Sequence, residues 1–266
     1  MTAIITADER LAGLLQKTGE IKKPPRIMVY GPQKIGKSTF AAMAPDPVFI
    51  QTEDGLDGLR DTAGTPINVP TFPLARTLAE VIDYIGLLYS SPHDRKTVAI
   101  DSADWLEALI WKRVAEDNKV GSIEEIGYGK GYIFALSHWR MILDGLNALR
   151  DQRGMAVILI AHAQIKRFEA PDQKASYDRY LPKLHHSAAA LIQEAVDVIG
   201  FANWDVQIAE EQVGFNQKVK RGTGQGLRTL RMEERPAFLA GSRYKMPPQI
   251  PLSWPDFAAA FAAATT

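Results

Sequence analysis

The sequence predicts an α/β fold in which a mostly parallel sheet is flanked by helices and continues into a C-terminal antiparallel extension. Two observations carry this prediction. Short apolar runs alternate with amphipathic segments of helical period, as in a parallel sheet that is covered on both faces. After about residue 195 the runs follow one another without helices between them, which is typical of antiparallel strands.

Composition and charge exclude several classes of protein. The chain has 266 residues, 46% of them apolar and 23% charged, as in ordinary globular proteins. Lys and Arg total 31, and so do Asp and Glu, so the chain is not a uniformly basic nucleic-acid coat. Cysteine is absent, which excludes disulfides, cysteine-bound metals and thiol nucleophiles. No apolar run reaches membrane-spanning length and no secretory signal is visible, so we expect a cytoplasmic location and no membrane partner.

The elements are expected in a definite order. Residues 1–25 form an N-terminal arm with a helix over 7–16, residues 26–250 form the core, and residues 251–266 form a tail with a short helix. Residues 164–186 are polar and are expected to be a loop, and a glycine-rich hairpin turn is expected at 222–226. The expected strands are 26–30, 47–51, 96–101, 156–161, 196–202, 217–220, 228–232 and 237–243. One helix is expected to begin at residue 39, and three more are expected over 74–89, 105–114 and 132–150.

A phosphate-binding loop follows the first strand. Residues 31–38 match the pattern G-x-x-x-x-G-K-[ST] between a predicted strand and a predicted helix. Such a loop surrounds phosphates with backbone N–H groups, places Lys37 on the β/γ oxygens of the nucleotide and gives the Ser38 hydroxyl to Mg²⁺. The alternative is a plain glycine turn with a solvated lysine. The predicted nucleotide-binding residues here are Gly31, Pro32, Gln33, Lys34, Ile35, Gly36, Lys37, Ser38 and Thr39.

Two acidic residues stand where strands end. Asp101 closes the third strand, at the sheet edge where ligands of α/β proteins bind, and could hold the Mg²⁺ shell with Ser38. Its alternative role is capping the next helix. Glu53 closes the second strand and could activate the water that attacks the γ-phosphate, or be an acid in a surface turn.

Several of these segments resemble the RecA-type recombinase ATPase core, and in particular small phage recombination ATPases. The resemblance lies in Tyr30 to Lys37, in the run Phe49 to Asp57, in Ile100-Asp101-Ser102, and in the strand that ends at His162. It implies that Glu53 activates water and that His162, where RecA has Gln, senses the γ-phosphate.

The resemblance extends to the base and to a neighbouring subunit. It implies that Asp57 lies near the adenine amine, and Arg60 stands where RecA places a stacking tyrosine. Arg243 matches a family lysine that reaches the nucleotide of the next subunit, which makes it a candidate finger in trans. Its alternative role is a solvated arginine on an edge strand.

Basic residues concentrate in three places that could bind single-stranded DNA. Residues 215–235 form a basic hairpin, and the loops at 119–132 and 164–186 mix basic and aromatic residues, as in single-strand-binding sites. In RecA-like proteins, loops at the latter two places bind DNA. The alternatives are a solubilising edge hairpin and a lid. The predicted DNA-binding residues are Lys130, Lys166, Arg167, Lys174, Arg179, Lys183, Lys218, Lys220 and Arg221.

The leading functional hypothesis is an ATPase of phage recombination type that uses ATP and Mg²⁺, binds single-stranded DNA and promotes annealing or strand exchange. The resemblance implies a ring or filament of identical subunits, a single-strand-binding protein as a possible partner, and the bacterial host cytoplasm if the chain is phage-encoded. One alternative is a small-molecule phosphotransferase with Arg167 and Arg179 on a lid. Another is a loader or regulatory protein that ATP clamps with little hydrolysis.

Overall fold

A computed structural model describes residues 23–61, 63–169, 175–205, 207–214, 217–223 and 226–265, and the side chains outside 206–225. Its strands are β1 (Arg26–Gly31), β2 (Pro47–Gln51), β3 (Thr97–Asp101), β4 (Ala156–Phe168), β5 (Tyr177–Pro182), β6 (Val198–Trp204), β7 (Gln207–Gly214), β8 (Gln217–Thr223), β9 (Arg228–Arg231), β10 (Gly241–Ser242) and β11 (Gln249–Pro251). Its helices are α2 (Lys37–Ala42), α3 (Leu78–Ser90), α4 (Ala103–Asp117), α5 (Lys130–Arg153), α6 (His186–Ala195) and α7 (Trp254–Ala264), with 3₁₀ turns η1 (Ile123–Glu125) and η2 (Gly127–Gly129).

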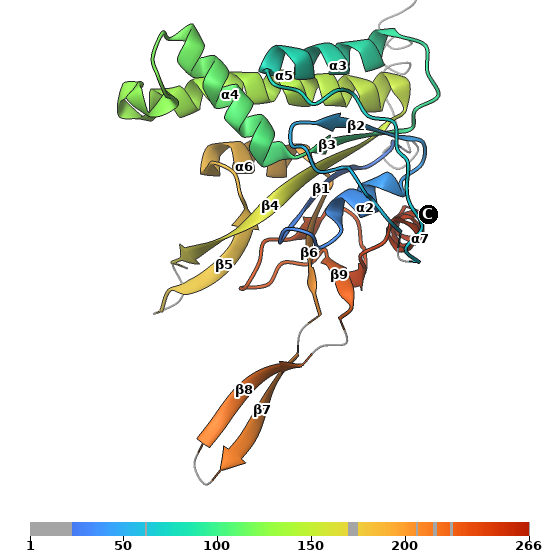
Figure 1. Ribbon diagram of the computed structural model, residues 1–266, viewed down its shortest axis with the longest axis vertical. Helices are drawn as coiled ribbons and strands as arrows, with labels where there is room; N and C mark the ends of the chain where they lie inside the picture. Colours follow the sequence, from blue (N-terminus) through green and yellow to red (C-terminus); the bar gives the residue numbers. More distant parts are fainter. Residues whose placement is uncertain are drawn as a thin grey trace, which may run out of the picture.

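One sheet organises the molecule (Figure 1). Its strand order is β11-β9-β6-β1-β4-β3-β2. β1 runs parallel to β4 and β6, and β3 runs parallel to β2 and β4. β9, β10 and β11 add antiparallel pairs beyond β6. The expected α/β class, with a parallel sheet and an antiparallel C-terminal extension, is confirmed.

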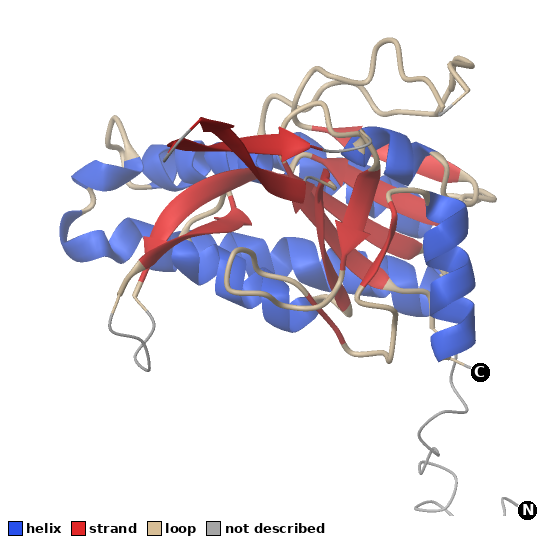
Figure 2. Ribbon diagram, turned by 90° about the horizontal axis from the view of Figure 1, so that it is seen from below, coloured by secondary structure: helices blue, strands red, loops and turns tan. Residues whose placement is uncertain are grey.

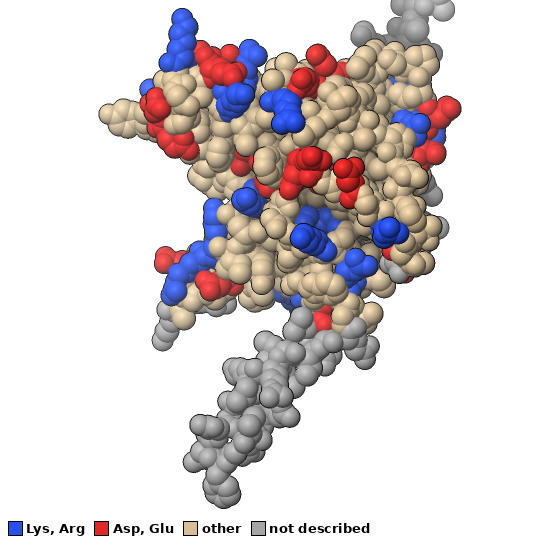
Figure 3. All heavy atoms as spheres, viewed as in Figure 1, with Lys and Arg blue, Asp and Glu red and all other residues tan. Residues whose placement is uncertain are grey.

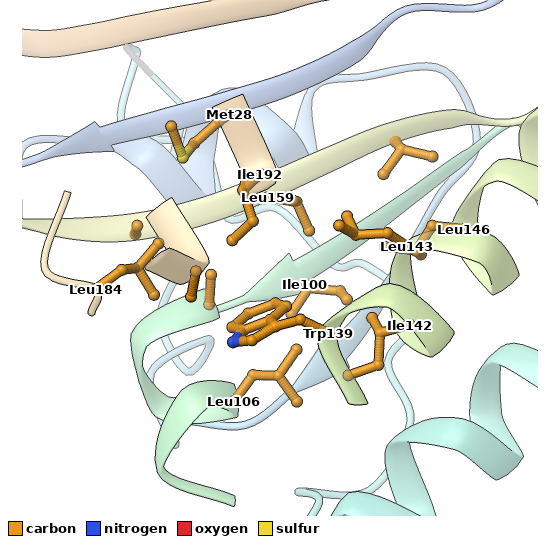
Figure 4. Close-up of a cluster of buried hydrophobic side chains, with 14 of the residues drawn as sticks. Met28, Ile100, Leu106, Trp139, Ile142, Leu143, Leu146, Leu159, Leu184 and Ile192 are labelled. Atoms are coloured by element: carbon orange, nitrogen blue, oxygen red, sulfur yellow. The ribbon is translucent and has the colours of Figure 1, made fainter. Parts of the chain in front are cut away.

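Helices cover both faces of the sheet because successive strand residues point to opposite sides. On one face, Met28, Ile100 and Leu159 pack with helices α3 to α6. Figure 4 shows Trp139 of α5 at the centre of that core. On the other face, Val29 and Ile160 pack with α2 and with Phe257 of α7. Figure 2 shows this arrangement from below, with α7 near the C-terminus.

Some helices begin or end at other residues than the sequence predicts, for local reasons. The helix expected from residue 74 begins at Leu78, because Thr77 and Glu80 form a reciprocal capping box there. α5 begins two residues earlier than expected and ends at Gly154, whose φ of 66° suits a glycine C-cap. The helix expected over residues 7–16 lies outside the described residues. Among the described residues, no helix is long and apolar enough to span a membrane.

Three expectations about the strands were wrong. Residues 164–186 are largely an antiparallel ribbon, in which β4 continues past the sheet and pairs with β5. Both faces of this ribbon carry polar residues, so the strand alternation is missing from the sequence. The strand before the turn expected at 222–226 has another partner: β8 pairs with β7 in a separate two-stranded sheet, and residues 224 and 225 lie outside the described residues. Of the expected strand 237–243, only Gly241–Ser242 forms a strand, and Phe238 makes isolated bridges to Tyr180 and Arg235.

Candidate nucleotide site

A cavity of about 510 Å³ opens beside the carboxyl ends of β1, β2, β3 and β4. Parallel strands present their last residues at one edge, so the ends of four separate segments converge there. Figure 3 shows Lys and Arg side chains around a hollow beside α2, with Asp and Glu side chains above it. Its lining residues are Gln33, Lys34, Gly36, Lys37, Ser38, Thr39, Glu53, Asp54, Gly55, Gly58, Leu59, Arg60, Asp101, His162 and Arg228.

The loop between β1 and α2 needs its two glycines. A Cβ on Gly31 would lie 2.2 Å from the carbonyl oxygen of Ala202 on β6, so no side chain fits. Gly36 has a φ of 110°, which L side chains rarely adopt. The loop is thus held tightly against β6 and turned so that α2 starts at once.

Lys37 lies inside this loop. Its ammonium donates hydrogen bonds to the carbonyl oxygens of Gly31 (3.1 Å) and Pro32 (2.8 Å). The side chain is buried, and this burial lowers the pKa of the ammonium below its ordinary value, while the Asp101 carboxylate works in the opposite direction. A lysine held in this way is ready to exchange carbonyl oxygens for phosphate oxygens.

Ser38 and Asp101 meet directly. The Ser38 hydroxyl donates to Asp101 Oδ2 at 2.5 Å, across 63 residues of sequence. Burial raises the pKa of the Asp101 carboxyl, and the hydrogen bond from Ser38 opposes that shift. Capping of α4 does not use Asp101, because Ser102 is the N-cap residue and makes no side-chain capping bond.

This pair fits magnesium. A hydroxyl and a carboxylate at one point are the hard oxygen donors that Mg²⁺ prefers. Within the described part of the chain, no group of three or more His, Cys, Asp and Glu side chains forms a metal cluster. Ser38 and Asp101 would therefore hold the ion together with phosphate and water oxygens.

Glu53 and His162 lie on the far side of the same cavity. The Ser102 hydroxyl donates to Glu53 Oε2 at 3.2 Å, and that oxygen lies 3.8 Å from His162 Nδ1. Thr52 helps to fix this corner, since its hydroxyl donates to the Ser102 carbonyl oxygen and accepts from the Ser102 amide. The Glu53 side chain keeps 30% exposure, so it can meet water.

Some residues of this site were missed by the sequence reasoning: Asp104, which lies behind the cavity, and the lining residues Asp54, Gly55, Gly58, Leu59 and Arg228. Asp104, on the first turn of α4, accepts hydrogen bonds from both the ring and the backbone amide of His162. Arg228, on β9, reaches the loop from the C-terminal extension, with Nη1 3.4 Å from the Ile35 carbonyl oxygen. The spacing Asp101-x-x-Asp104 was a usable signal, whereas nothing in the sequence placed Arg228 near Ile35, 193 residues earlier.

The two residues expected near the adenine base, Asp57 and Arg60, lie in different places. Arg60 lines the cavity, and its carbonyl accepts a long hydrogen bond of 3.5 Å from the Thr39 hydroxyl. Asp57 is exposed and is not among the lining residues. The structure therefore brings Arg60, but not Asp57, to the nucleotide cavity.

Arg243 lies at the opposite end of the sheet. β10 pairs with the start of β6, and the Arg243 guanidinium contacts Asp197 Oδ1 at 3.4 Å and the Glu194 carbonyl. Asp197 is buried and also binds Arg26 and Arg150. Burial alone would raise the pKa of Asp197, but its hydrogen bonds from Arg26 outweigh that and lower it. Arg243, with 53% side-chain exposure, cannot reach this chain's own loop from there.

The predicted DNA-binding residues differ in how exposed their side chains are. Lys130, Lys166, Arg167 and Lys183 are exposed. The predicted DNA-binding role of Arg179 is corrected. Its side chain is buried, paired with Glu234 and packed over the Phe168 ring, so its role is structural. Lys174 lies outside the described residues, and Lys218, Lys220 and Arg221 lie on β8, whose side chains are not described.

The segments 119–132 and 164–186, which were both predicted to bind DNA, lie close together. Tyr132, at the start of α5, stacks on His185, at the end of the segment after β5, with ring centroids 4.2 Å apart. The exposed ribbon residues and the η1–η2 segment thus belong to one side of the molecule. In Figure 3, Lys and Arg side chains, mixed with Asp and Glu, border an indentation between the ribbon and the helices.

The mostly parallel sheet and the loop between β1 and α2 define a P-loop ATPase of the α/β class. The chain belongs to the family described as the AAA domain, whose model matches residues 23–244. Among solved structures, the crystal structure of the RadB recombinase is similar at 16% identity and a TM-score of 0.43, covering 78% of this chain and 87% of that one. A search of curated proteins finds no significant match.

Proposed function

We propose that this chain is a Mg²⁺-dependent ATPase whose ATP-bound form binds single-stranded DNA along the β4–β5 ribbon and the loop before α5. The bound DNA would then be annealed or exchanged with a second strand. A coupling of this kind needs a physical link between the phosphate site and the DNA surface, and β4 supplies one.

The observation that carries the proposal is the continuity of β4. Ile158 to His162 pair with β1 in the sheet, and from Ala163 onward the same strand pairs with β5 in the ribbon. The Lys183 amide, at the end of the ribbon, donates to the His162 carbonyl oxygen at 2.8 Å. A movement of His162 toward a phosphate would therefore be transmitted directly to both strands at the base of the ribbon.

The surface of the ribbon suits a single strand. Lys166 and Arg167 are exposed beside Ile165, which has 59% exposure, and Phe168 contacts Tyr177. Phosphates can pair with the cations while bases stack on apolar and aromatic surface. Tyr128, fully exposed in η2, offers a further stacking platform.

At the phosphates, each residue of this chain has a distinct task. Lys37 and the backbone N–H groups of the loop hold the β- and γ-phosphates. Mg²⁺, held by Ser38 and Asp101, would neutralise charge between those phosphates. Glu53 orients the attacking water and accepts its proton, and Ser102 fixes the carboxylate for that task.

Self-association completes the proposal. Arg243 is distant from its own cavity but half exposed, so it would serve the nucleotide of a neighbouring copy in a ring or filament. A single-strand-binding protein would be a natural partner of such an assembly. Neither Arg167 nor Arg179 is among the residues that line the cavity, which leaves the phosphotransferase alternative without its lid.

The test is ATP hydrolysis with and without a single-stranded oligonucleotide. We expect stimulation by DNA in the wild type, loss of stimulation with normal basal hydrolysis in Lys166→Ala/Arg167→Ala, and no effect of Arg76→Ala/Lys96→Ala, a matched pair of basic residues away from the ribbon. Glu53→Gln should bind ATP and DNA but not turn over. Normal ATP binding without any DNA effect, or phosphate transfer to a small molecule, would contradict the proposal.

A further inference from the structure

His162 is held by one carboxylate through two hydrogen bonds. Its ring Nδ1 lies 2.9 Å from Asp104 Oδ2, and its backbone amide donates to Asp104 Oδ1 at 3.0 Å. The Asp104 side chain is only 4% exposed and the His162 side chain 15%. Such a doubly bound, buried carboxylate leaves the imidazole little freedom to rotate.

Asp104 is ionised in this setting. Burial alone would raise the pKa of its carboxyl, but the hydrogen bonds from the His162 ring and amide outweigh burial and lower it. An ionised carboxylate can only accept, so Nδ1 must carry the hydrogen between the two groups. This fixes the tautomer of the neutral ring, with the lone pair on Nε2.

The fixed tautomer has a chemical consequence. Nε2 has no hydrogen-bond partner among the described residues, and His162 lines the nucleotide cavity. The lone pair of a neutral ring would face phosphate oxygens that also carry lone pairs, so the two would repel. Nε2 can donate to a phosphate only after the ring takes up a second proton and becomes an imidazolium.

We propose that Asp104 is a positioning residue that makes His162 a proton-linked sensor, so that binding of ATP, but not of ADP, takes up a proton from solvent onto Nε2. The inference rests on the proposed function in one respect, namely that ATP binds in this cavity. The proton comes from water, no bond of the nucleotide breaks in this step, and release of the γ-phosphate returns the proton.

Charged groups on several elements surround the ring. Asp104 of α4 contacts it, Glu53 after β2 lies 3.8 Å away, and Asp101 of β3 acts on it electrostatically. On the opposite side, Lys37 of α2 lines the same cavity. From the ribbon, Lys183 contributes its backbone amide. Lys34, Arg60 and Arg228 line the same cavity, so the charge that distinguishes ATP from ADP at this ring is that of the γ-phosphate.

The test is calorimetric titration of a non-hydrolysable ATP analogue and of ADP, each with Mg²⁺, in buffers of different ionisation enthalpy between pH 6 and 9.5. The dependence of the heat on the buffer gives the protons taken up. Terminal phosphates lose their last proton near pH 6, so uptake at higher pH belongs to the protein. We expect uptake approaching one proton for the ATP analogue in part of this range, and a much smaller value for ADP.

Two variants separate positioning from a merely structural role. Asp104→Asn should abolish the extra proton uptake and reduce the preference for the ATP analogue over ADP by at least about tenfold, as loss of a charge-assisted hydrogen bond does. His162→Gln supplies a neutral donor, so it should retain the preference while removing its pH dependence.

The outcomes distinguish the proposed proton-linked sensor from the proposed ATPase function. Equal proton uptake for the two nucleotides at every pH, or an unchanged pH profile in Asp104→Asn, would overturn the sensor inference while leaving the proposed ATPase intact. Failure of the wild type to bind either nucleotide would refute the proposed function itself. Circular dichroism of each variant checks that it is folded.

Discussion

Replacement of Glu107 by Gln should stabilise the protein above neutral pH. Glu107 lies on α4, one turn after Asp104, and is 4% exposed. Its Oε2 accepts a hydrogen bond from the His185 amide at 2.9 Å, whereas Oε1 has no partner in the described structure. Burial raises the pKa of this carboxyl to about 7. Glutamine keeps the acceptor without carrying a charge.

The magnitude and sign follow from linkage. In the unfolded chain the carboxyl titrates at its ordinary value of 4.5, and in the folded protein at about 7. Between these values the folded state holds a proton that the unfolded state has released, so stability falls as pH rises and levels off above pH 7. The full difference corresponds to about 3 kcal/mol. The wild type loses this amount across the window, and the glutamine variant does not.

Urea unfolding at several pH values between 4.5 and 8.5, followed by tryptophan fluorescence, measures this difference. We expect the stability gap between Glu107→Gln and the wild type to grow by about 3 kcal/mol from the acid to the alkaline end. Glu116→Gln, an exposed position on the same helix, serves as the matched control and should stay parallel to the wild type. A pH-independent gap for Glu107→Gln would show that the buried carboxyl does not titrate differently in the folded and unfolded states.

Three further predictions concern the frame of the site. Asp197→Ala leaves Arg26 and Arg150 without their buried partner and should cost about 3–5 kcal/mol in chemical unfolding, and a loss below 1 kcal/mol would contradict the role of this cluster. Gly31→Ala forces a methyl group against the Ala202 carbonyl and should lower the melting temperature and weaken nucleotide binding together, so wild-type binding would argue against the tight loop. Arg228→Ala should weaken binding of ATP about tenfold or more with the fold unchanged, as measured by equilibrium titration, and equal affinity would remove Arg228 from the site.

Much of the parallel core could be predicted because its strands are buried on both faces and therefore read as short apolar runs. Residues 26–31, 47–51 and 97–101 are such strands. The β4–β5 ribbon could not be predicted in this way, because both of its faces carry polar residues and so show no apolar alternation. Its first strand is the continuation of an apolar one, and nothing local marks the change at Ala163.

The candidate site divides in a similar manner. Lys37, Ser38 and the two glycines are close in sequence and carry a pattern, so they could be predicted together. Asp101 and Glu53 followed from the ends of neighbouring strands. Arg228 could not, since its position depends on how the antiparallel extension folds back over the loop. Arg179 was misjudged because composition alone does not show that Glu234 pairs with it.

The proposed coupling of ATP binding to DNA binding is tested most directly with a fluorescent single-stranded oligonucleotide. Its binding is measured by anisotropy with a non-hydrolysable ATP analogue, with ADP, and without nucleotide. We expect markedly tighter binding with the ATP analogue in the wild type. We expect no such gain in Lys37→Ala, which lacks the phosphate contact, or in Lys166→Ala/Arg167→Ala, which lacks the ribbon cations. Equal affinity in all nucleotide states, in a protein that demonstrably binds ATP, would contradict the proposed coupling.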